Sequence, residues 1–69
     1  MAYLGWMDDN PHRTPTDKLR AAIAAYVERF GVRPLVVRVN DQEPVPDPCG
    51  LQVVRESYIR RNNFYVGMN

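Results

Sequence analysis

The sequence has few of the residues from which small proteins build covalent or metal cross-links. Cys49 is the only cysteine and His12 the only histidine among its 69 residues. A disulfide within the chain is therefore excluded, and no Cys/His spacing of a structural zinc site is present. A domain this short buries only about 60% of the surface that its unfolded chain exposes, so its stability is marginal. Self-association is the remaining common remedy, and we expect it here.

Long apolar runs and an excess of one charge are also missing. No apolar stretch is long enough to span a membrane, and the N-terminus lacks the pattern of a signal peptide, so we expect a cytoplasmic location. Nine basic against eight acidic residues give a net charge of +1, which argues against a dedicated binder of duplex DNA. The phosphate-binding spacings G-x-G-x-x-G and G-x-x-x-x-G-K are absent. We therefore expect no cofactor and no metal.

The clearest structural signal is an amphipathic helix between Thr14 and Gly31. Thr14 stands three residues before Asp17, which predicts a capping box, and Pro15 falls at the first helical position, where its missing N–H costs nothing. Gly31 supplies the left-handed residue that ends a helix. The stripe expected to face the core consists of Leu19, Ala22, Ile23, Tyr26, Val27 and Phe30. The opposite face carries Lys18, Arg20, Glu28 and Arg29.

Two short runs of β-branched and aromatic residues predict strands on either side of this helix. Residues 35–39 form the second run, and alternation places Leu35, Val37 and Val39 beneath the helix. Tyr3–Met7 precedes a cluster of turn formers and is predicted as the first strand. Strand, helix and strand would form a βαβ unit, in which the two strands run parallel.

A stiff acidic loop is predicted at residues 40–50. It contains three prolines and three acidic residues, and we expect it to project from the sheet and to end in a type I turn at residues 47–50. Cys49 lies in that turn. Acidic neighbours offer no stabilisation to a thiolate, so we expect an exposed and unreactive thiol.

The last part of the chain is predicted as two strands, at residues 51–56 and 64–68. The connection at residues 57–63 leaves two alternatives open. Asn62 and Asn63 tolerate the positive φ of a type I′ turn, which favours a hairpin. A tight helical turn through Tyr58 to Arg61 is the other alternative.

Together these elements predict a single α+β domain over residues 1–69. One helix would pack on one face of a mixed sheet of three or four strands, with a βαβ unit followed by two strands. A single helix covers only one face of such a sheet. The other face is therefore expected to meet water or a partner.

The uncovered face carries the strongest functional signal. Alternation and the hairpin register assign to it Val36, Arg38, Val54, Tyr58, Arg60 and Tyr65. Tyrosine and arginine are enriched at binding hot spots, which favours a non-enzymatic protein-interaction or adaptor module, homodimeric through this face. The interaction residues predicted are Arg38, Tyr58, Arg60 and Tyr65. The alternative is an RNA or single-stranded DNA binder using the same face, since aromatics on an open sheet stack bases; near-neutral charge counts against it.

Catalytic candidates lack the spacing that chemistry demands. Asp8, Asp9 and His12 are residue types found in metal and acid/base sites. Asp-Asp-Asn-Pro is equally what a turn before a helix requires, so whether these residues form a site stays open. A nucleophilic Cys49 would need a base such as His12 beside it. We therefore expect no enzymatic activity.

Overall fold

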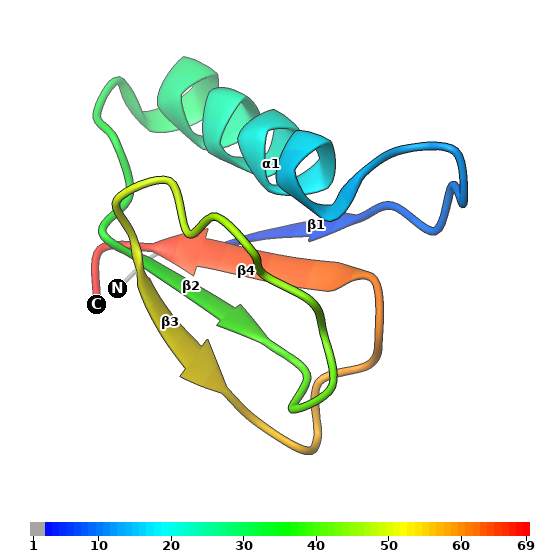
Figure 1. Cartoon of the computed structure of the whole chain (residues 1–69). Coiled ribbons are helices and arrows are strands. Elements are labelled where there is room, and N and C mark those ends of the chain that lie inside the picture. Colours follow the sequence, from blue (N-terminus) through cyan, green and yellow to red (C-terminus); the bar gives the residue numbers. More distant parts are fainter. Residues whose placement is uncertain (1–2) are drawn as a thin grey trace.

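The computed structural model describes residues 3–69, and they form an α+β fold of two layers. In chain order the elements are β1 (Tyr3–Met7), α1 (Pro15–Phe30), β2 (Val36–Val39), β3 (Gln52–Arg55) and β4 (Asn63–Gly67). The four strands make one mixed sheet in the order β1-β4-β2-β3, and α1 lies across one of its faces (Figure 1). The predicted fold class is confirmed.

Local sequence signals define both ends of α1 as predicted. The hydroxyl of Thr14 accepts a hydrogen bond from the N–H of Asp17 at 3.1 Å, and Pro15 is the first helical residue. Gly31 is left-handed, with a φ of 76°, and its N–H donates to the carbonyl of Val27. These bonds satisfy backbone groups that a helix end leaves without partners.

The buried side of α1 differs from the predicted stripe at its two ends. Val27 and Phe30 are 36% and 38% exposed, so the last turn of the helix adds little to the core. At the first turn, Lys18 was expected on the wet face but is buried, because its ammonium reaches Asn62 Oδ1 at 3.3 Å. A long lysine stem can cover apolar surface while its charged end finds a polar partner.

The sheet order corrects the predicted hairpin. β1 and β2 both pair antiparallel with β4, so they run parallel to each other, as predicted, but with β4 between them. β3 pairs in parallel with the far side of β2 and is not a neighbour of β4. Because β4 pairs with two strands instead of one, its backbone is satisfied on both sides, which a hairpin at the sheet edge would not achieve.

The connection at residues 57–63 is neither a hairpin nor a helical turn. Two successive turns carry the chain from β3 to β4: the N–H of Ile59 donates to the carbonyl of Glu56, and the N–H of Asn63 to that of Arg60, both at 3.3 Å. Asn62 has a φ of 69°, the left-handed conformation that asparagine tolerates.

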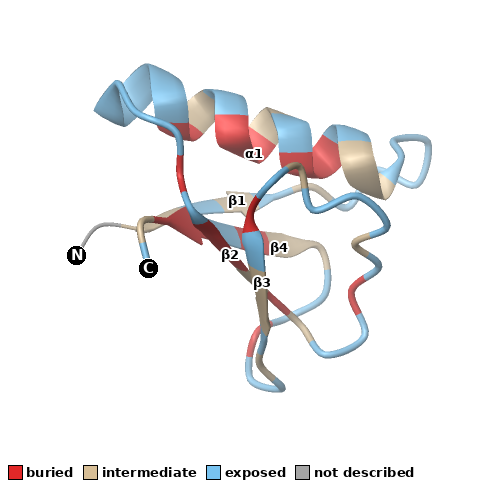
Figure 2. Ribbon diagram, turned by 60° about the vertical axis from the view of Figure 1, so that its left-hand side comes forward, coloured by how far each residue is buried: buried red, intermediate tan, exposed pale blue. Residues whose placement is uncertain are grey.

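The core lies between α1 and the helix-facing side of the sheet (Figure 2). Its buried members are Leu19, Ala22, Ile23, Tyr26, Val37, Val39, Leu51, Phe64 and Val66. Trp6 packs against this cluster, although its buried indole N–H has no hydrogen-bond partner within residues 3–69.

Leu35 does not join this core, contrary to the alternation argument. Its side chain is 56% exposed. The N–H of Leu35 bonds the carbonyl of Gly67, and Val36 also lies opposite Gly67 in the strand register. Two residues facing one is the pattern of a β-bulge, which breaks the alternation of sides just before β2 begins.

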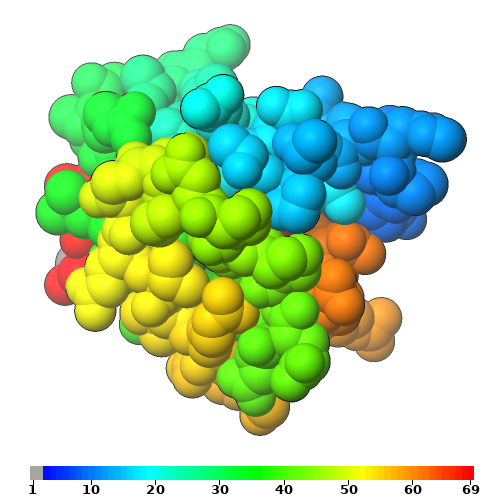
Figure 3. Space-filling view, in the orientation of Figure 1, coloured from blue at the N-terminus to red at the C-terminus, as the bar shows by residue number. Residues whose placement is uncertain are grey.

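The segment between β2 and β3 folds back instead of projecting. Val45 and Cys49 pack against the core cluster, and the space-filling view shows this segment lying against α1 (Figure 3). The predicted type I turn is also wrong: the N–H of Leu51 donates to the carbonyl of Pro48, and Cys49 and Gly50 between them have φ of 55° and 82°. Positive φ at both central positions is typical of type I′.

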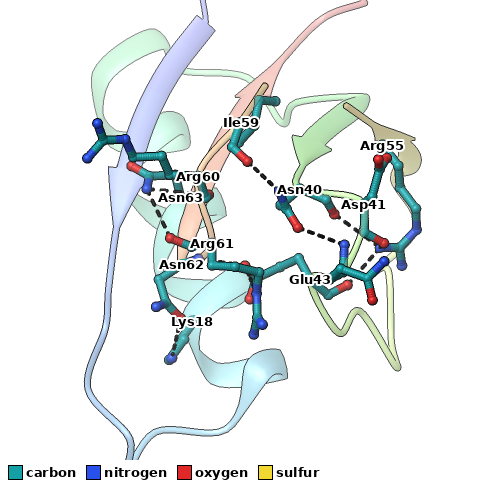
Figure 4. Close-up of polar contacts among 11 residues, drawn as sticks. Lys18, Asn40, Asp41, Glu43, Arg55, Ile59, Arg60, Arg61, Asn62 and Asn63 are labelled. Atoms are coloured by element: carbon teal, nitrogen blue, oxygen red, sulfur yellow. Dashed lines mark hydrogen bonds and ion pairs between the residues drawn. The ribbon is translucent and has the colours of Figure 1, made fainter. Parts of the chain in front are cut away.

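A buried carboxylate fixes this segment to the turn before β4. Glu43 is only 2% exposed, and its Oε1 accepts from the N–H of Asn62 and from Nε of Arg61, the latter at 3.2 Å (Figure 4). Hydrogen bonds to an ionised acceptor are stronger than neutral ones. The acidic segment is therefore part of the folded body, because Glu43 binds polar groups that a projecting loop would leave in solvent.

Two further side chains hold the start of the same segment. One guanidinium nitrogen of Arg55, Nη1, donates to the carbonyls of Asn40, Asp41 and Glu43 at 3.3, 3.2 and 2.7 Å. The side-chain amide of Asn40 donates to the carbonyl of Ile59 at 2.6 Å (Figure 4). The two long connections of the sheet thus brace each other.

Truncating the helix stripe tests where the core lies. Ile23→Ala removes a side chain that is 6% exposed, and we expect it to lower the free energy of unfolding by roughly 2–5 kcal/mol in a denaturant titration. Arg20→Ala, on the exposed side of α1, is the control and should change stability little. A loss of less than about half a kcal/mol for Ile23→Ala would show that this face of α1 is not packed.

A second substitution tests the buried carboxylate. Glu43→Gln keeps the shape but removes the charge that strengthens the bonds to Asn62 and Arg61, so unfolding should become easier by about 1–3 kcal/mol. Asp41→Asn neutralises an exposed acid of the same segment and should have little effect in the same titration. Equal effects of the two changes would contradict the bracing role of Glu43.

Candidate interaction surface

The helix-free side of the sheet holds a concavity of about 390 Å³ in which the predicted interaction residues meet. Its lining consists of Tyr3, Arg38, Tyr58, Ile59, Arg60, Asn63 and Tyr65. All four predicted interaction residues, Arg38, Tyr58, Arg60 and Tyr65, are among them. We call Tyr3, Arg38, Tyr58, Arg60 and Tyr65 the tyrosine–arginine surface.

Three strands and one turn position these side chains. Tyr3, Arg38 and Tyr65 alternate along β1, β2 and β4 with residues that face the helix, and Arg38 lies directly opposite Tyr65 in the register. Tyr58 and Arg60 come from the connection after β3, not from a strand. They reach the surface because the two turns of that connection pass along the helix-free side of the sheet. The sequence predicted the same grouping from a hairpin that does not form.

Two valines that were assigned to the same face play no part in the concavity. Val36 is 5% exposed and Val54 is half-buried, and neither lines the hollow. Both lie toward the β3 side of the sheet, where Val36 pairs with Gln52 and Val54 with Arg38.

Glycines set the positions of two tyrosine rings. A Cβ atom added to Gly67 would lie 2.8 Å from two ring carbons of Tyr3, and one added to Gly5 would lie 3.0 Å from a ring carbon of Tyr65. Gly67 faces Tyr3, and Gly5 faces Tyr65, across the β1–β4 pair. Each ring therefore rests on backbone that only glycine leaves bare, an arrangement that fixes aromatic side chains on a sheet.

Tyr3 is the surface residue that sequence reasoning missed. The signal for it exists, since Tyr3 alternates with Leu4 and Trp6, which face the core. The residues that Tyr3 contacts could not be predicted from alternation, because they depend on the pairing of β1 with β4, which no local pattern predicts.

A polar chain links four side chains across the surface. Nε of Arg38 donates to the hydroxyl of Tyr3 at 3.2 Å, and its guanidinium carbon lies 5.5 Å from the centre of the Tyr3 ring. On its other side Arg38 Nη1 lies 3.5 Å from Glu56 Oε2, which also accepts a hydrogen bond from the hydroxyl of Tyr58 at 2.9 Å. Arg38 is thus held between an aromatic ring and a carboxylate.

These contacts shift the pKa values of two side chains in the direction that preserves the polar contacts between them. The hydrogen bond from Tyr58 to Glu56 raises the pKa of the Tyr58 hydroxyl, with desolvation and the negative charge of Glu56 acting in the same direction. The hydrogen bond to Tyr3 raises the pKa of Arg38, which stays charged. A raised pKa favours the protonated form of each group, in which Tyr58 can donate to Glu56 and Arg38 carries its positive charge.

Arg60 differs from Arg38 in being free to bind a ligand. Its guanidinium makes no hydrogen bond or ion pair with any residue from 3 to 69, and it points away from the polar cluster beneath it (Figure 4). Tyr58 and Tyr65 beside it are 75% and 38% exposed. The surface therefore offers one uncommitted cation next to two accessible aromatic rings.

The acidic cluster near the N-terminus is used to build the turn before α1. Asp8 accepts from the N–H of Asn10 at 3.0 Å and pairs with Nε of Arg13 at 2.9 Å, and Asn10 in turn accepts from the N–H of His12. His12 is exposed. In the part of the chain that the structure describes, no three His, Cys, Asp or Glu residues are grouped so that they could hold a metal ion.

Cys49 lies apart from the tyrosine–arginine surface, on the side of the sheet that α1 covers. It is half-buried instead of exposed, and it borders a groove between α1 and the connection that precedes β3. Its N–H donates to Asp47 Oδ1 at 2.9 Å, so the aspartate that was expected to start the turn does stabilise it.

Comparison with known proteins finds no family model, no curated protein and no solved structure that matches this chain. Within residues 3–69, no helix has the length and apolar character needed to cross a membrane.

The link between Glu56 and Tyr58 generates a titration test. Glu56→Gln removes the negative charge that favours the protonated phenol, so Tyr58 should lose its proton at a lower pH than in the native protein. The pH dependence of the Tyr58 ring resonances in NMR spectra measures this. Glu28→Gln, an exposed change on α1, should leave the Tyr58 pKa unchanged; an equally unchanged pKa in Glu56→Gln would show that the hydrogen bond does not form.

Proposed function

We propose that the protein is a small non-enzymatic interaction module that binds a protein partner through its tyrosine–arginine surface. One observation carries the proposal: three tyrosine rings and two guanidinium groups line a single open concavity on the side of the sheet that α1 leaves uncovered. Tyrosine, tryptophan and arginine dominate the binding energy of protein interfaces when they cluster near the centre of a contact.

The rigidity of the surface supports this function. Tyr3 and Tyr65 rest against glycines, and Arg38 is held between Tyr3 and Glu56. Side chains that are already ordered lose little conformational entropy when a partner arrives. A sheet face that only contacts water has no need of such preorganisation. Ordered side chains therefore favour a surface that binds a folded or extended protein segment.

The charge of the surface favours a partner that brings a carboxylate. Arg60 has no acid beside it in the described structure, and the one acid in the polar chain, Glu56, already contacts Arg38 and Tyr58. Burying this face against its own copy, as the sequence suggested, would bring the arginines of both copies into one desolvated interface, which is costly. A second copy is better accommodated elsewhere on the sheet.

A specific observation also favours the nucleic-acid alternative. Tyr65 rests on Gly5 yet stays 38% exposed, so part of its ring is open to stack on a base of single-stranded RNA or DNA, and Arg60 could contact a phosphate. The net charge of +1 argues against nucleic-acid binding, since contacts to phosphates are made mainly by lysine and arginine on a basic surface.

Paired substitutions test the surface. The native chain and the double variant Tyr65→Ala with Arg60→Ala are each used as bait in extracts of the source cells, and the captured proteins are quantified by mass spectrometry. The double variant should retain at least about 10-fold less of each partner than the native chain does. Both residues are exposed, so folding should change much less than in Ile23→Ala. Arg20→Ala is the matched control on the α1 side.

Two results would contradict this proposal. If the double variant captures the same proteins in the same amounts, the surface is not the binding site. If instead the native chain shifts an oligouridine probe in a gel, with an affinity that falls steeply with salt and is lost in the double variant, the RNA-binding alternative replaces the protein partner.

A further inference from the structure

Strand β1 (Tyr3–Met7) forms one edge of the sheet, and only its β4 side is paired. We propose that this edge pairs with β1 of a second copy of the chain, and that the two sheets join into one. This pairing uses backbone groups of β1, whereas the tyrosine–arginine surface is made of side chains, that of Tyr3 among them, and the pairing does not depend on the function of that surface.

The strand register shows which backbone groups are free to pair. The N–H of Asp8 donates to the carbonyl of Asn62, and in an antiparallel ladder hydrogen-bonded residues recur at every second position. Leu4 and Trp6 therefore direct their N–H and C=O groups toward β4. Tyr3, Gly5 and Met7 direct theirs outward, where no residue of the described chain lies beside them.

The outer edge of β1 lacks the features that keep sheet edges apart. Natural edge strands are blunted by charged side chains, prolines, bulges or an overlying loop. Residues 3–7 contain no charged residue and no proline, and the register with β4 runs without interruption. Met7, at its end, is 61% exposed. This edge is open to another strand.

The opposite edge of the sheet is less available. β3 (Gln52–Arg55) is one residue shorter and ends in Arg55, whose guanidinium is bound to three carbonyls of the preceding connection. Its pairing with β2 uses the N–H groups of Gln52 and Glu56, which leaves only Val53 and Arg55 directed outward. Self-pairing is therefore better matched to β1 than to β3.

A second copy fits the β1 edge because the edge is complementary to itself. With a two-fold axis at Gly5, each Gly5 exchanges two hydrogen bonds with the other Gly5, and Tyr3 of each copy exchanges two with Met7 of the other. Identical uncharged strands bring no like charges together. On the α1 side, Leu4 of each copy would lie opposite Trp6 of the other and cover the exposed remainder of both side chains.

Edge pairing would leave the proposed partner surface accessible. The two sheets would continue into one another, so the tyrosine–arginine surfaces of both copies would lie on the same side of one larger sheet. A partner with two acidic segments could then bind both, and the avidity of such binding depends on the spacing between them. Because only five residues of each chain meet, the contact is small and the dimer is expected to be weak.

Solution mass and amide exchange test the pairing together. Light scattering on the full chain from about 10 µM to 1 mM should show the mass rising from one chain toward two, the range suited to a weak contact. Over that range the amide exchange of Tyr3, Gly5 and Met7 should slow at least about 10-fold. Leu4 and Trp6, bonded to β4, should be protected at every concentration and are the internal control.

A proline variant separates this edge from other surfaces. Met7→Pro removes only an outward N–H, hence two of the six bonds in the dimer, and should weaken dimerisation by about 10- to 100-fold while far-UV circular dichroism stays native. Ser57→Pro adds a proline at an exposed turn position and should dimerise like the native chain. The proposal is wrong if the mass stays that of one chain up to 1 mM, if a dimer forms with Gly5 unprotected, or if Met7→Pro dimerises normally.

Discussion

β4 lies inside the sheet, between β1 and β2, and the other elements are arranged around it. By pairing with β1 on one side and β2 on the other, it joins the two strands that flank α1 into one sheet. Phe64 and Val66 face α1 and are fully buried, while Tyr65 between them faces the other way. A single strand therefore completes the core and places an aromatic ring between Gly5 and Arg38, at the centre of the tyrosine–arginine surface.

The chain reaches β4 by connections that are themselves structural. The parallel step from β2 to β3 is made without a helix, and Glu43, Arg55 and Asn40 hold that connection against the turns before β4. A chain with one cysteine cannot fix its loops with an internal disulfide, and the hydrogen bonds of these three side chains hold the loops instead. The same turns carry Tyr58 and Arg60 to the open side of the sheet, so the bracing and the candidate surface share a cause.

Local features of this fold could be predicted from the sequence, and long-range ones could not. The ends of α1 follow from Thr14, Asp17 and Gly31, whose capping bonds lie within a few residues of one another. The strand order follows from pairings between distant segments. The expected hairpin was wrong because turn-forming residues show where the chain bends but not which strand the next strand pairs with. Burial of Glu43 likewise requires Asn62, nineteen residues away, which no local pattern can indicate.

The insertion of β4 lays the rings of Tyr3 and Tyr65 on Gly67 and Gly5, and so builds one rigid surface with Arg38. The Hα resonances of the two glycines test it most directly, because a proton beneath an aromatic face is shifted upfield. The structure predicts upfield-shifted Hα signals for both glycines, each with a nuclear Overhauser effect to its tyrosine ring. Unshifted glycine protons without such contacts would show that the two rings do not lie on these glycines.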